Sequence, residues 1–264
     1  MGVRENKCKI FICSMLCSLS FCACDRDMEV QPESAVMQSE AVTGSWEEET
    51  AMAGEVFVLP DLSGAENADE VLALLIEDEG FRECVRYSDM EIEDDSAPES
   101  ILRMMAECES LVLREAPYGR AICSLESLSL FPNLRQLVID ISEWNDSAIE
   151  DFTPIAQLSG LEQLYVSYGK EQTIDLSFIG GMRGITDLYL TQCDIADLSF
   201  LEQMPQLQRL SLYGTPVADM AVLENLTELV ELSLAGNENA EHMEVVGTLT
   251  RLQDLGIQYC GIED

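Results

Sequence analysis

Side chains that commonly carry out catalysis are sparse in this chain of 264 residues. His242 is the only histidine, so a histidine metal cluster lacks ligands and a Ser-His-Asp triad is improbable. The glycine-rich phosphate-binding motifs and the calcium-loop pattern do not occur in the sequence, although Asp and Glu together number 50. Pairs of carboxylates could still perform glycosidase chemistry, but that chemistry needs an enclosed site. We therefore expect no enzymatic activity, no bound metal and no cofactor.

Tyrosine offers a different chemistry, because its ring supplies a large contact area at low entropic cost. Tyr165, Tyr189 and Tyr213 follow one another at intervals of 24 residues. We interpret them as the leading candidates for contact with a ligand, while a second interpretation is that tyrosine simply favours strands. The remaining candidates for ligand contact are Tyr168, Tyr259, Arg135, Asp187 and Arg209.

These candidates lie in a stretch that repeats the pattern L-x-x-L-x-L. Successive copies begin 27, 24, 22, 22 and 23 residues apart, and a weaker copy begins at Cys108. A repeat of this length cannot bury its own apolar side chains, but a stack of repeats shares one continuous core. We therefore predict that residues 108–264 form a solenoid of about seven strands. The six clear copies begin at Leu134, Leu161, Ile185, Leu207, Leu229 and Leu252.

A helix-capping residue stands ten positions before most of these first leucines. An Asp or Ser there accepts a hydrogen bond from a backbone N–H of a following helical turn. A unit of about 22 residues has room for a strand and one or two such turns. The strands must be parallel, because every repeat runs in the same direction. The caps are Ser124, Asp151, Asp175, Asp197 and Asp219, and we predict that His242 is an imperfect cap in the same place.

In a strand of the form L-x-x-L-x-L the leucines point inward and the intervening residues face solvent. The middle exposed column is predicted to contain Val138, Tyr165, Tyr189, Ser211, Ser233 and Gly256. The next column contains Asp140, Ser167, Thr191, Tyr213, Ala235 and Gln258. We expect Cys193 and Cys260 to be small buried apolar groups that lie too far apart for a disulfide. Pairing of Cys84 with Cys108, or of Cys108 with Cys123, is left open.

The repeats resemble the leucine-rich repeat family, and in particular its bacterial, internalin-like class of 22 residues. Residues 207–229 match that pattern except at its asparagine position, and Asn237 stands where the family has its buried asparagine. Cys193, Thr215 and Cys260 replace this asparagine elsewhere. The resemblance implies an α/β solenoid with a curved parallel sheet on its concave side and short α or 3₁₀ turns on its convex side. It also implies that insertions at 142–149 and 169–173 bulge at the sheet edge.

Residues 55–107 are predicted to cap the N-terminal end of the solenoid, because the first repeat has no neighbour on one side. We expect a short strand at 56–59, a helix at 68–79 that Gly80 ends, and a second helix at 99–107. At the other end no C-terminal cap is expected. The last strand, at 255–258, is therefore predicted to be an exposed edge.

The N-terminal segment 1–23 has a basic start followed by an apolar run of signal-peptide length. The sequence Phe21-Cys22-Ala23-Cys24 resembles a bacterial lipoprotein signal, in which Cys24 carries a lipid after cleavage. A plain cleaved signal or an uncleaved anchor are the alternatives. Residues 24–54 are acidic, lack an apolar period and are predicted to be a flexible tether. We expect an exported protein, held by the lipid at the bacterial cell membrane or cell surface.

The formal charge of −36 argues against a nucleic-acid partner, which would need clustered Lys and Arg. The leading hypothesis is a surface-anchored, non-enzymatic protein that binds a protein ligand through its concave face. The alternatives are a structural or assembly component of the cell envelope and a glycan-binding surface protein.

Overall fold

A computed structural model describes residues 59–114, 119–141, 148–169, 172–195, 197–216, 219–238 and 241–260. The chain divides into two units, Met1–Val56 and Phe57–Asp264, and all of the described residues lie in the second unit. The tether, Cys24 and residues 56–58 of the expected strand lie outside the described residues, as do residues 142–147 of the first insertion and residues 170–171 of the second.

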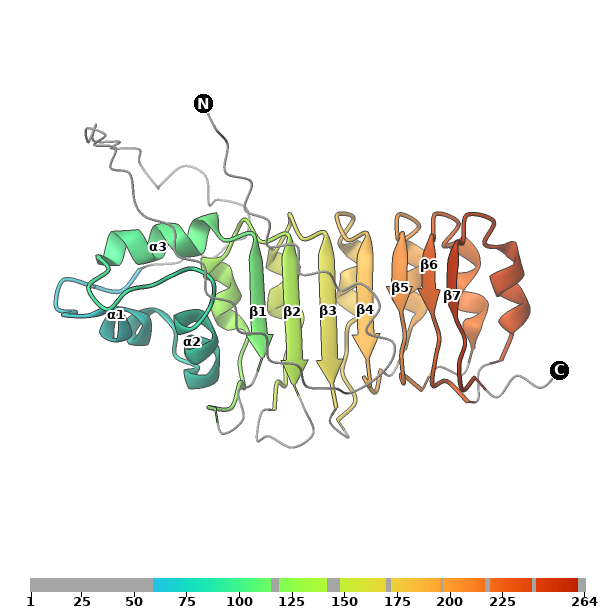
Figure 1. Ribbon diagram of the computed structural model, residues 1–264, viewed down its shortest axis with the longest axis horizontal. Helices are drawn as coiled ribbons and strands as arrows, with labels where there is room; N and C mark the ends of the chain where they lie inside the picture. The colour runs from blue at the N-terminus through green and yellow to red at the C-terminus, as the bar shows by residue number, and fades with distance from the viewer. Residues whose placement is uncertain are drawn as a thin grey trace, which may run out of the picture. The chain divides into compact units, whose positions relative to one another are not determined.

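Seven parallel strands form one sheet in the order of the chain, from β1 to β7 (Figure 1). Short 3₁₀ helices alternate with the strands and lie behind the sheet in this view. The strands are β1 (Ser110–Arg114), β2 (Gln136–Ile141), β3 (Gln163–Tyr168), β4 (Asp187–Thr191), β5 (Arg209–Ser211), β6 (Glu231–Ser233) and β7 (Asp254–Gly256). The 3₁₀ helices are η1 (Glu126–Leu130), η2 (Thr153–Gln157), η3 (Ser177–Gly181), η4 (Ser199–Gln203), η5 (Met220–Asn225) and η6 (Met243–Thr248). This architecture confirms the predicted leucine-rich-repeat solenoid.

The repeated leucines form one core between the sheet and the 3₁₀ helices. Leu137, Leu164 and Leu188 occupy the same register position on consecutive strands, and each is 0% exposed. Continuous burial of this kind needs a neighbour on both sides of every repeat, so each repeat depends on the next one for its stability.

The predicted caps begin the helical turns as expected. The carboxylates of Asp151, Asp175, Asp197 and Asp219 each accept a hydrogen bond of 2.8 Å from the backbone N–H two residues later. These bonds lower the pKa of the carboxyl groups of Asp175, Asp197 and Asp219. The pKa of Asp151 is lowered first by a side-chain hydrogen bond with Thr153 and then by the backbone bond. His242 makes no capping bond, adopts a left-handed conformation at φ 58° and hydrogen-bonds Asp219 through Nδ1 at 2.8 Å.

A column of buried donors joins successive repeats at the turn after each strand. The amide nitrogen of Asn237 donates to the carbonyls of Leu212 and Leu234, both at 2.7 Å. Thr215, Cys193 and Cys260 take the same place and donate to the carbonyl of the preceding repeat through one hydroxyl or thiol. The two cysteines are 0% and 4% exposed, as predicted. Neither Cys108 nor Cys123 is in a disulfide, so neither of the pairings left open is formed.

Three helices precede the sheet, where the sequence indicated two. They are α1 (Ala68–Leu75), α2 (Glu79–Arg86) and α3 (Pro98–Glu107), and α2 packs against β1. The prediction that Gly80 ends a helix is wrong, because Gly80 lies in the first turn of α2. A Cβ atom on Gly80 would stand 2.3 Å from the carbonyl oxygen of Ala121, so glycine permits close approach of this helix to the first repeat.

Asp78 fastens the same junction from the N-terminus of α2. Its Oδ1 accepts from the N–H of Phe81 at 2.7 Å and so caps the helix. Its Oδ2 accepts from the N–H groups of Cys123 and Ser124, at 2.8 and 3.0 Å. One carboxylate therefore satisfies three backbone donors in two parts of the chain that are more than 40 residues apart in sequence.

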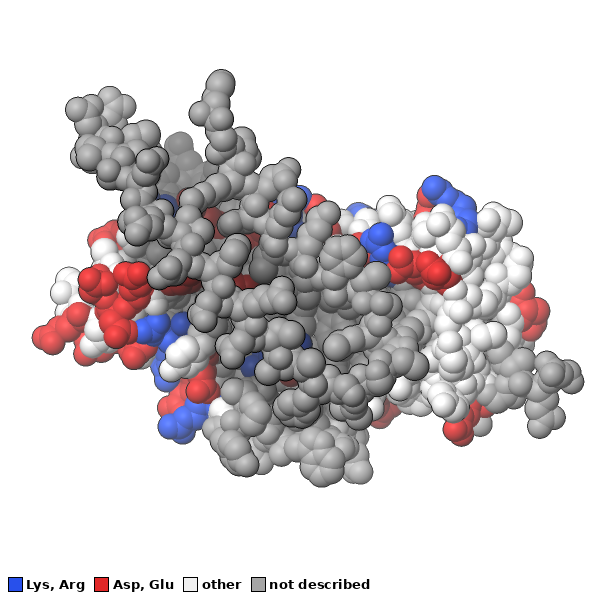
Figure 2. Space-filling model, viewed as in Figure 1, with Lys and Arg blue, Asp and Glu red and all other residues white. Residues whose placement is uncertain are grey.

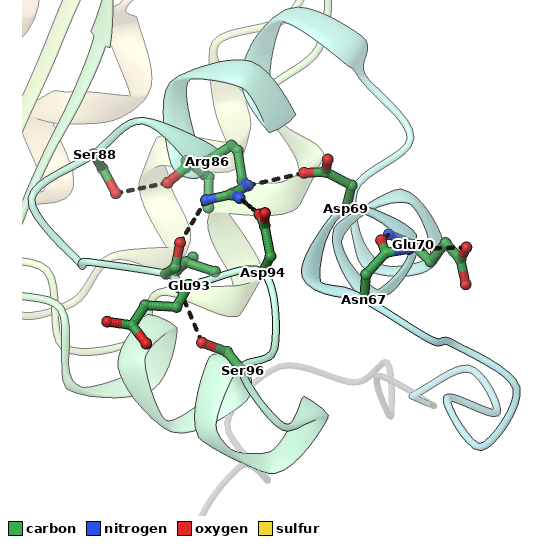
Figure 3. Close-up of polar contacts among 10 residues, drawn as sticks. Asn67, Asp69, Glu70, Arg86, Ser88, Glu93, Asp94 and Ser96 are labelled. Atoms are coloured by element: carbon green, nitrogen blue, oxygen red, sulfur yellow. Dashed lines mark hydrogen bonds and ion pairs between the residues drawn. The ribbon is translucent and has the colours of Figure 1, made fainter.

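Arg86 holds the helices and their connecting loop together (Figure 3). Its guanidinium contacts Asp69 at the start of α1 at 2.8 Å, and it also pairs with Asp94 and donates to the carbonyl of Ile92. The hydrogen bond with Asp69, before any other cause, raises the pKa of Arg86. No helix within the described residues is long and apolar enough to cross a membrane.

Candidate interaction surface

The face of the sheet opposite the leucine core, which we call the open face, is organised in rows that run across the strands. The strand register aligns the first row as Ser110, Gln136, Gln163, Asp187, Arg209, Glu231 and Asp254. It aligns the middle row as Val112, Val138, Tyr165, Tyr189, Ser211, Ser233 and Gly256. From Val138 onward, the middle row contains the residues that the repeat pattern predicted.

The middle row has large side chains over β3 and β4. Tyr165 and Tyr189 are half-buried, and their ring centroids lie 6.3 Å apart with the planes tilted by 37°. Contact between neighbouring rings limits the rotamers of both side chains, so little conformational entropy remains to be lost on binding. Two tyrosines thus form an ordered aromatic surface in the centre of the open face.

Over β5 to β7 the side chains of the middle row are small, and we call this part of the open face the low floor. Ser211 and Ser233 are followed by Gly256, where an added Cβ would stand 3.2 Å from the Oγ of Ser233. Ser233 is only 8% exposed, and its Oγ has no hydrogen-bond partner. Tyr213, just past β5, is 37% exposed beside this low floor. A polar atom that is buried without a partner is uncommon and marks a place where a ligand group could bind.

The first row contains a charged cluster that is satisfied within the protein. Arg209 contacts Asp187 at 2.5 Å and Glu231 at 3.4 Å, and Thr186 donates to Asp187 at 2.8 Å. The hydrogen bond with Asp187 is the main cause of the raised pKa of Arg209. The side chain of Asp187 is 5% exposed, so the expectation that it is accessible to a ligand is wrong. The guanidinium of Arg209 remains partly exposed.

Tyr168 is also corrected by the structure. It is the last residue of β3, it points into the core and it is 0% exposed. Its ring packs edge-on against Phe152 with centroids 5.5 Å apart, and its hydroxyl accepts from the N–H of Ile149 at 3.1 Å. The strand continues one residue beyond the leucine pattern, so the alternation turns this tyrosine inward.

Arg135 lies at the rim of the sheet, one residue before the first row. It pairs with Glu162 and, at 3.8 Å, with Glu109. These side chains, with Glu107 and Thr186, line an open groove of about 790 Å³ beside the N-terminal ends of β1 to β4. Tyr259 lies at the far end of the array, 82% exposed and at φ 59°. The candidate residues therefore divide between the open face, the rim and the core.

The space-filling view shows acidic side chains in red and a smaller number of basic ones in blue (Figure 2). Each arginine of the rim and of the first row discussed above is paired with an acid. Across the described residues, His, Cys, Asp and Glu nowhere gather in a group of three or more that could hold a metal ion. The unpartnered hydroxyl of Ser233 was not foreseen, because the sequence pattern gives its row but not its hydrogen bonding.

The fold and this surface define a leucine-rich-repeat solenoid. Internalin C2 from Listeria monocytogenes is similar with a TM-score of 0.54 at 18% identity, over 76% of this chain and 91% of that one. The functional domain of InlJ from the same organism, which includes a cysteine ladder, has a TM-score of 0.50 at 17% identity, over 71% and 38%. These likenesses show the fold.

A third similar structure is an internalin, inlF, from Listeria monocytogenes. Its TM-score is 0.47 at 26% identity, over 60% of this chain. This chain spans 44% of that protein's length. No protein-family model and no curated protein matches the sequence.

Proposed function

We propose that this protein is a non-enzymatic binding protein whose open face engages a protein partner. The observation that carries the proposal is the ordered pair of Tyr165 and Tyr189 in the middle row. Aromatic side chains that are held in place before binding are typical of the few residues that dominate the energy of protein interfaces.

The low floor beside the tyrosine pair extends the proposed contact. A partner side chain that enters above Ser233 could donate a hydrogen bond to its Oγ or accept one from it, and so satisfy an atom that has no partner in the protein. Tyr213 would cover such a side chain from the flank. The proposed footprint therefore runs from β3 to β6.

We further propose that the protein is exported and held at the bacterial cell surface by a lipid on Cys24. This proposal rests on the basic, apolar and Cys-containing order of residues 1–24. A Cys24→Ala variant should pass from the membrane fraction to the soluble fraction. Retention of this variant in the membrane would contradict the lipid anchor.

Affinity capture with the full chain tests the binding proposal. A Tyr165→Ala/Tyr189→Ala variant should lose the partner that the parent captures, while Tyr87→Ala should retain it. Tyr87 is a matched control because it is 80% exposed and follows α2, outside the seven strands of the sheet. Circular dichroism of each variant checks that the fold is unchanged.

The outcomes separate the alternatives. Equal capture by the parent and the double variant would contradict the role of the tyrosine pair. Binding to a glycan array without capture of any protein would favour a glycan-binding protein. Capture of another cell-envelope component would favour a structural or assembly role.

A further inference from the structure

Ser233 carries a buried hydroxyl that the protein does not satisfy. The residue is 8% exposed, and its Oγ has no hydrogen-bond partner. An unpaired buried polar group lowers stability, whereas alanine at this position would keep the backbone and leave nothing unpaired. Serine therefore costs stability here, and a ligand that bonds to the hydroxyl would offset that cost.

A free volume above Gly256, which we call the Gly256 space, lies against this hydroxyl. An added Cβ on Gly256 would stand 3.2 Å from the Oγ of Ser233 and 3.4 Å from the Oε1 of Gln258. Two oxygens therefore converge on the volume that the glycine leaves free. A hydroxyl oxygen and an amide carbonyl oxygen both accept hydrogen bonds, so this volume suits a group that donates them.

The first row gives this part of the open face an excess of negative charge. From β4 to β7 it contains three carboxylates and one guanidinium, those of Asp187, Glu231, Asp254 and Arg209. The guanidinium is already paired with Asp187 and Glu231. Residues two apart in a strand lie on the same face about 7 Å apart, so Glu231 and Asp254 stand beside the low floor. A cation in the Gly256 space is therefore attracted and an anion is repelled.

The surface around the Gly256 space is otherwise neutral. Figure 2 shows the open face over β6 and β7 as mainly white, with charged side chains along one side of it. The backbone bonds from Gly214 to Ala235 and from Gly236 to Gln258, both 2.9 Å, continue the strand register past the strand ends. Tyr213 and Gln258 therefore stand on either side of Ala235, which is 2% exposed. An apolar stem can lie across Ala235 against the ring of Tyr213.

We propose that the low floor is a subsite for a lysine side chain of the protein partner, an inference that rests on the proposed function and extends its footprint to β7. The ammonium occupies the Gly256 space and donates to the Oγ of Ser233 and the Oε1 of Gln258. Both side chains turn toward it as it enters. The carboxylates of Glu231 and Asp254 balance its charge, and its methylene groups cover the neutral surface, as the long stems of lysine commonly do.

Lysine fits these observations better than the other donors that a protein offers. An ammonium has three donors and no acceptor, so it matches a space lined by acceptors. It is also compact, whereas the guanidinium of arginine is a wide planar fork that favours bidentate contact with one carboxylate. A neutral hydroxyl or amide would satisfy Ser233 but would gain nothing from the carboxylates of the first row.

Titration of the isotope-labelled full chain with Nα-acetyl-lysine amide tests the proposal by NMR. The probe should shift the backbone amide signals of Ser233, Ala235 and Gly256 in a saturable way. The same probe acetylated on Nε keeps the stem and loses the charge, and Nα-acetyl-arginine amide keeps the charge and changes the shape. Each of these two should bind at least about tenfold more weakly, because charge-assisted hydrogen bonds or their geometry are lost.

Two substitutions act on the subsite from opposite sides. Gly256→Ala fills the space, and Ser233→Ala removes one acceptor; each should weaken lysine binding by about tenfold or more. Ser233→Ala should also leave the urea midpoint unchanged or raise it, because it removes an unpaired buried hydroxyl. Ser211→Ala is the matched control, since it makes the same change on the neighbouring strand and should bind lysine as the parent does.

The results distinguish this subsite from the proposed function. Absence of shifts at these three amides, equal binding of the Nε-acetylated probe, or unchanged binding in both Gly256→Ala and Ser233→Ala would overturn the lysine subsite. If Ser233→Ala captures the protein partner as well as the parent while Tyr165→Ala/Tyr189→Ala loses it, the protein-binding face stands and the lysine subsite falls. Specific lysine shifts without a role for the tyrosine pair would support the subsite and count against the proposed function.

Discussion

Replacement of Asp78 by alanine should weaken the junction between the N-terminal helices and the first repeat, and so lower the free energy of unfolding. The carboxylate of Asp78 caps α2 through Phe81 and also accepts from the N–H groups of Cys123 and Ser124. The Asp78→Ala variant leaves all three donors without this acceptor. Glu83 of α2 also accepts from the N–H of Arg120 in the segment before η1, at 2.7 Å, but Asp78 satisfies two donors of that segment and caps the helix as well.

The magnitude follows from the three bonds. Loss of an N-cap costs about 1 kcal/mol. Each further backbone donor left without a partner costs about 1–3 kcal/mol where water cannot reach it. Cys123 is exposed and Ser124 is half-buried, so water replaces part of the loss and the lower values apply. We expect a total of about 2–4 kcal/mol.

The matched control is Asn67→Ala at the N-terminus of α1. Asn67 caps its helix by accepting from the N–H of Glu70 at 3.0 Å, but it does not bond the repeats. Urea unfolding followed by circular dichroism gives the free energy of unfolding of each variant. Asn67→Ala should cost about 1 kcal/mol, so Asp78→Ala should cost at least about twice as much. Equal losses in the two variants would refute the junction role of Asp78.

Three further predictions follow from single residues. Burial raises the pKa of the Cys193 thiol to about 12. An alkylating reagent at pH 8 should therefore label the exposed Cys123 in the folded protein, and Cys193 only after denaturation, as measured by mass spectrometry. Labelling of both cysteines in the folded protein would contradict the burial of Cys193. The hydrogen bond to Asp219 raises the pKa of His242, so the contribution of the pair to stability is complete below the ordinary histidine pKa and is lost as pH rises through the higher folded value. NMR titration of this sole imidazole should show the raised pKa, and Asp219→Asn should return it toward the ordinary value; an unchanged pKa would argue against the pair. Asn237→Ala removes two buried hydrogen bonds and should lower the free energy of unfolding by about 2–4 kcal/mol in urea; a loss below about 1 kcal/mol would contradict its place between repeats.

The sequence determined the architecture because its signals were periodic. Leucines at a fixed spacing can share a core only when their repeats stack, and this single requirement predicted the parallel sheet and the middle row. The capping aspartates were equally predictable, since Asp175 and Asp197 act through residues two positions away. Local and repeated interactions are visible in a sequence.

The errors came from features that occur once. Glycine often ends a helix, but Gly80 instead allows α2 to approach the backbone of Ala121, which is distant in sequence and close in space. Tyr168 continues the alternation of β3 by one residue, and the length of a strand is not fixed by the leucine pattern. The burial of Asp187 depends on Arg209 in the next repeat. Contacts of this kind need the tertiary structure.

Photo-cross-linking from the open face tests the central claim most directly. A benzophenone amino acid would replace Tyr165 in the middle row, and in a second chain it would replace Glu202, which is exposed on η4 behind the sheet. Irradiation in cells that express each chain should yield a covalent adduct with another protein from position 165 and not from position 202. Adducts from position 202 alone would contradict the claim that the open face is the binding surface.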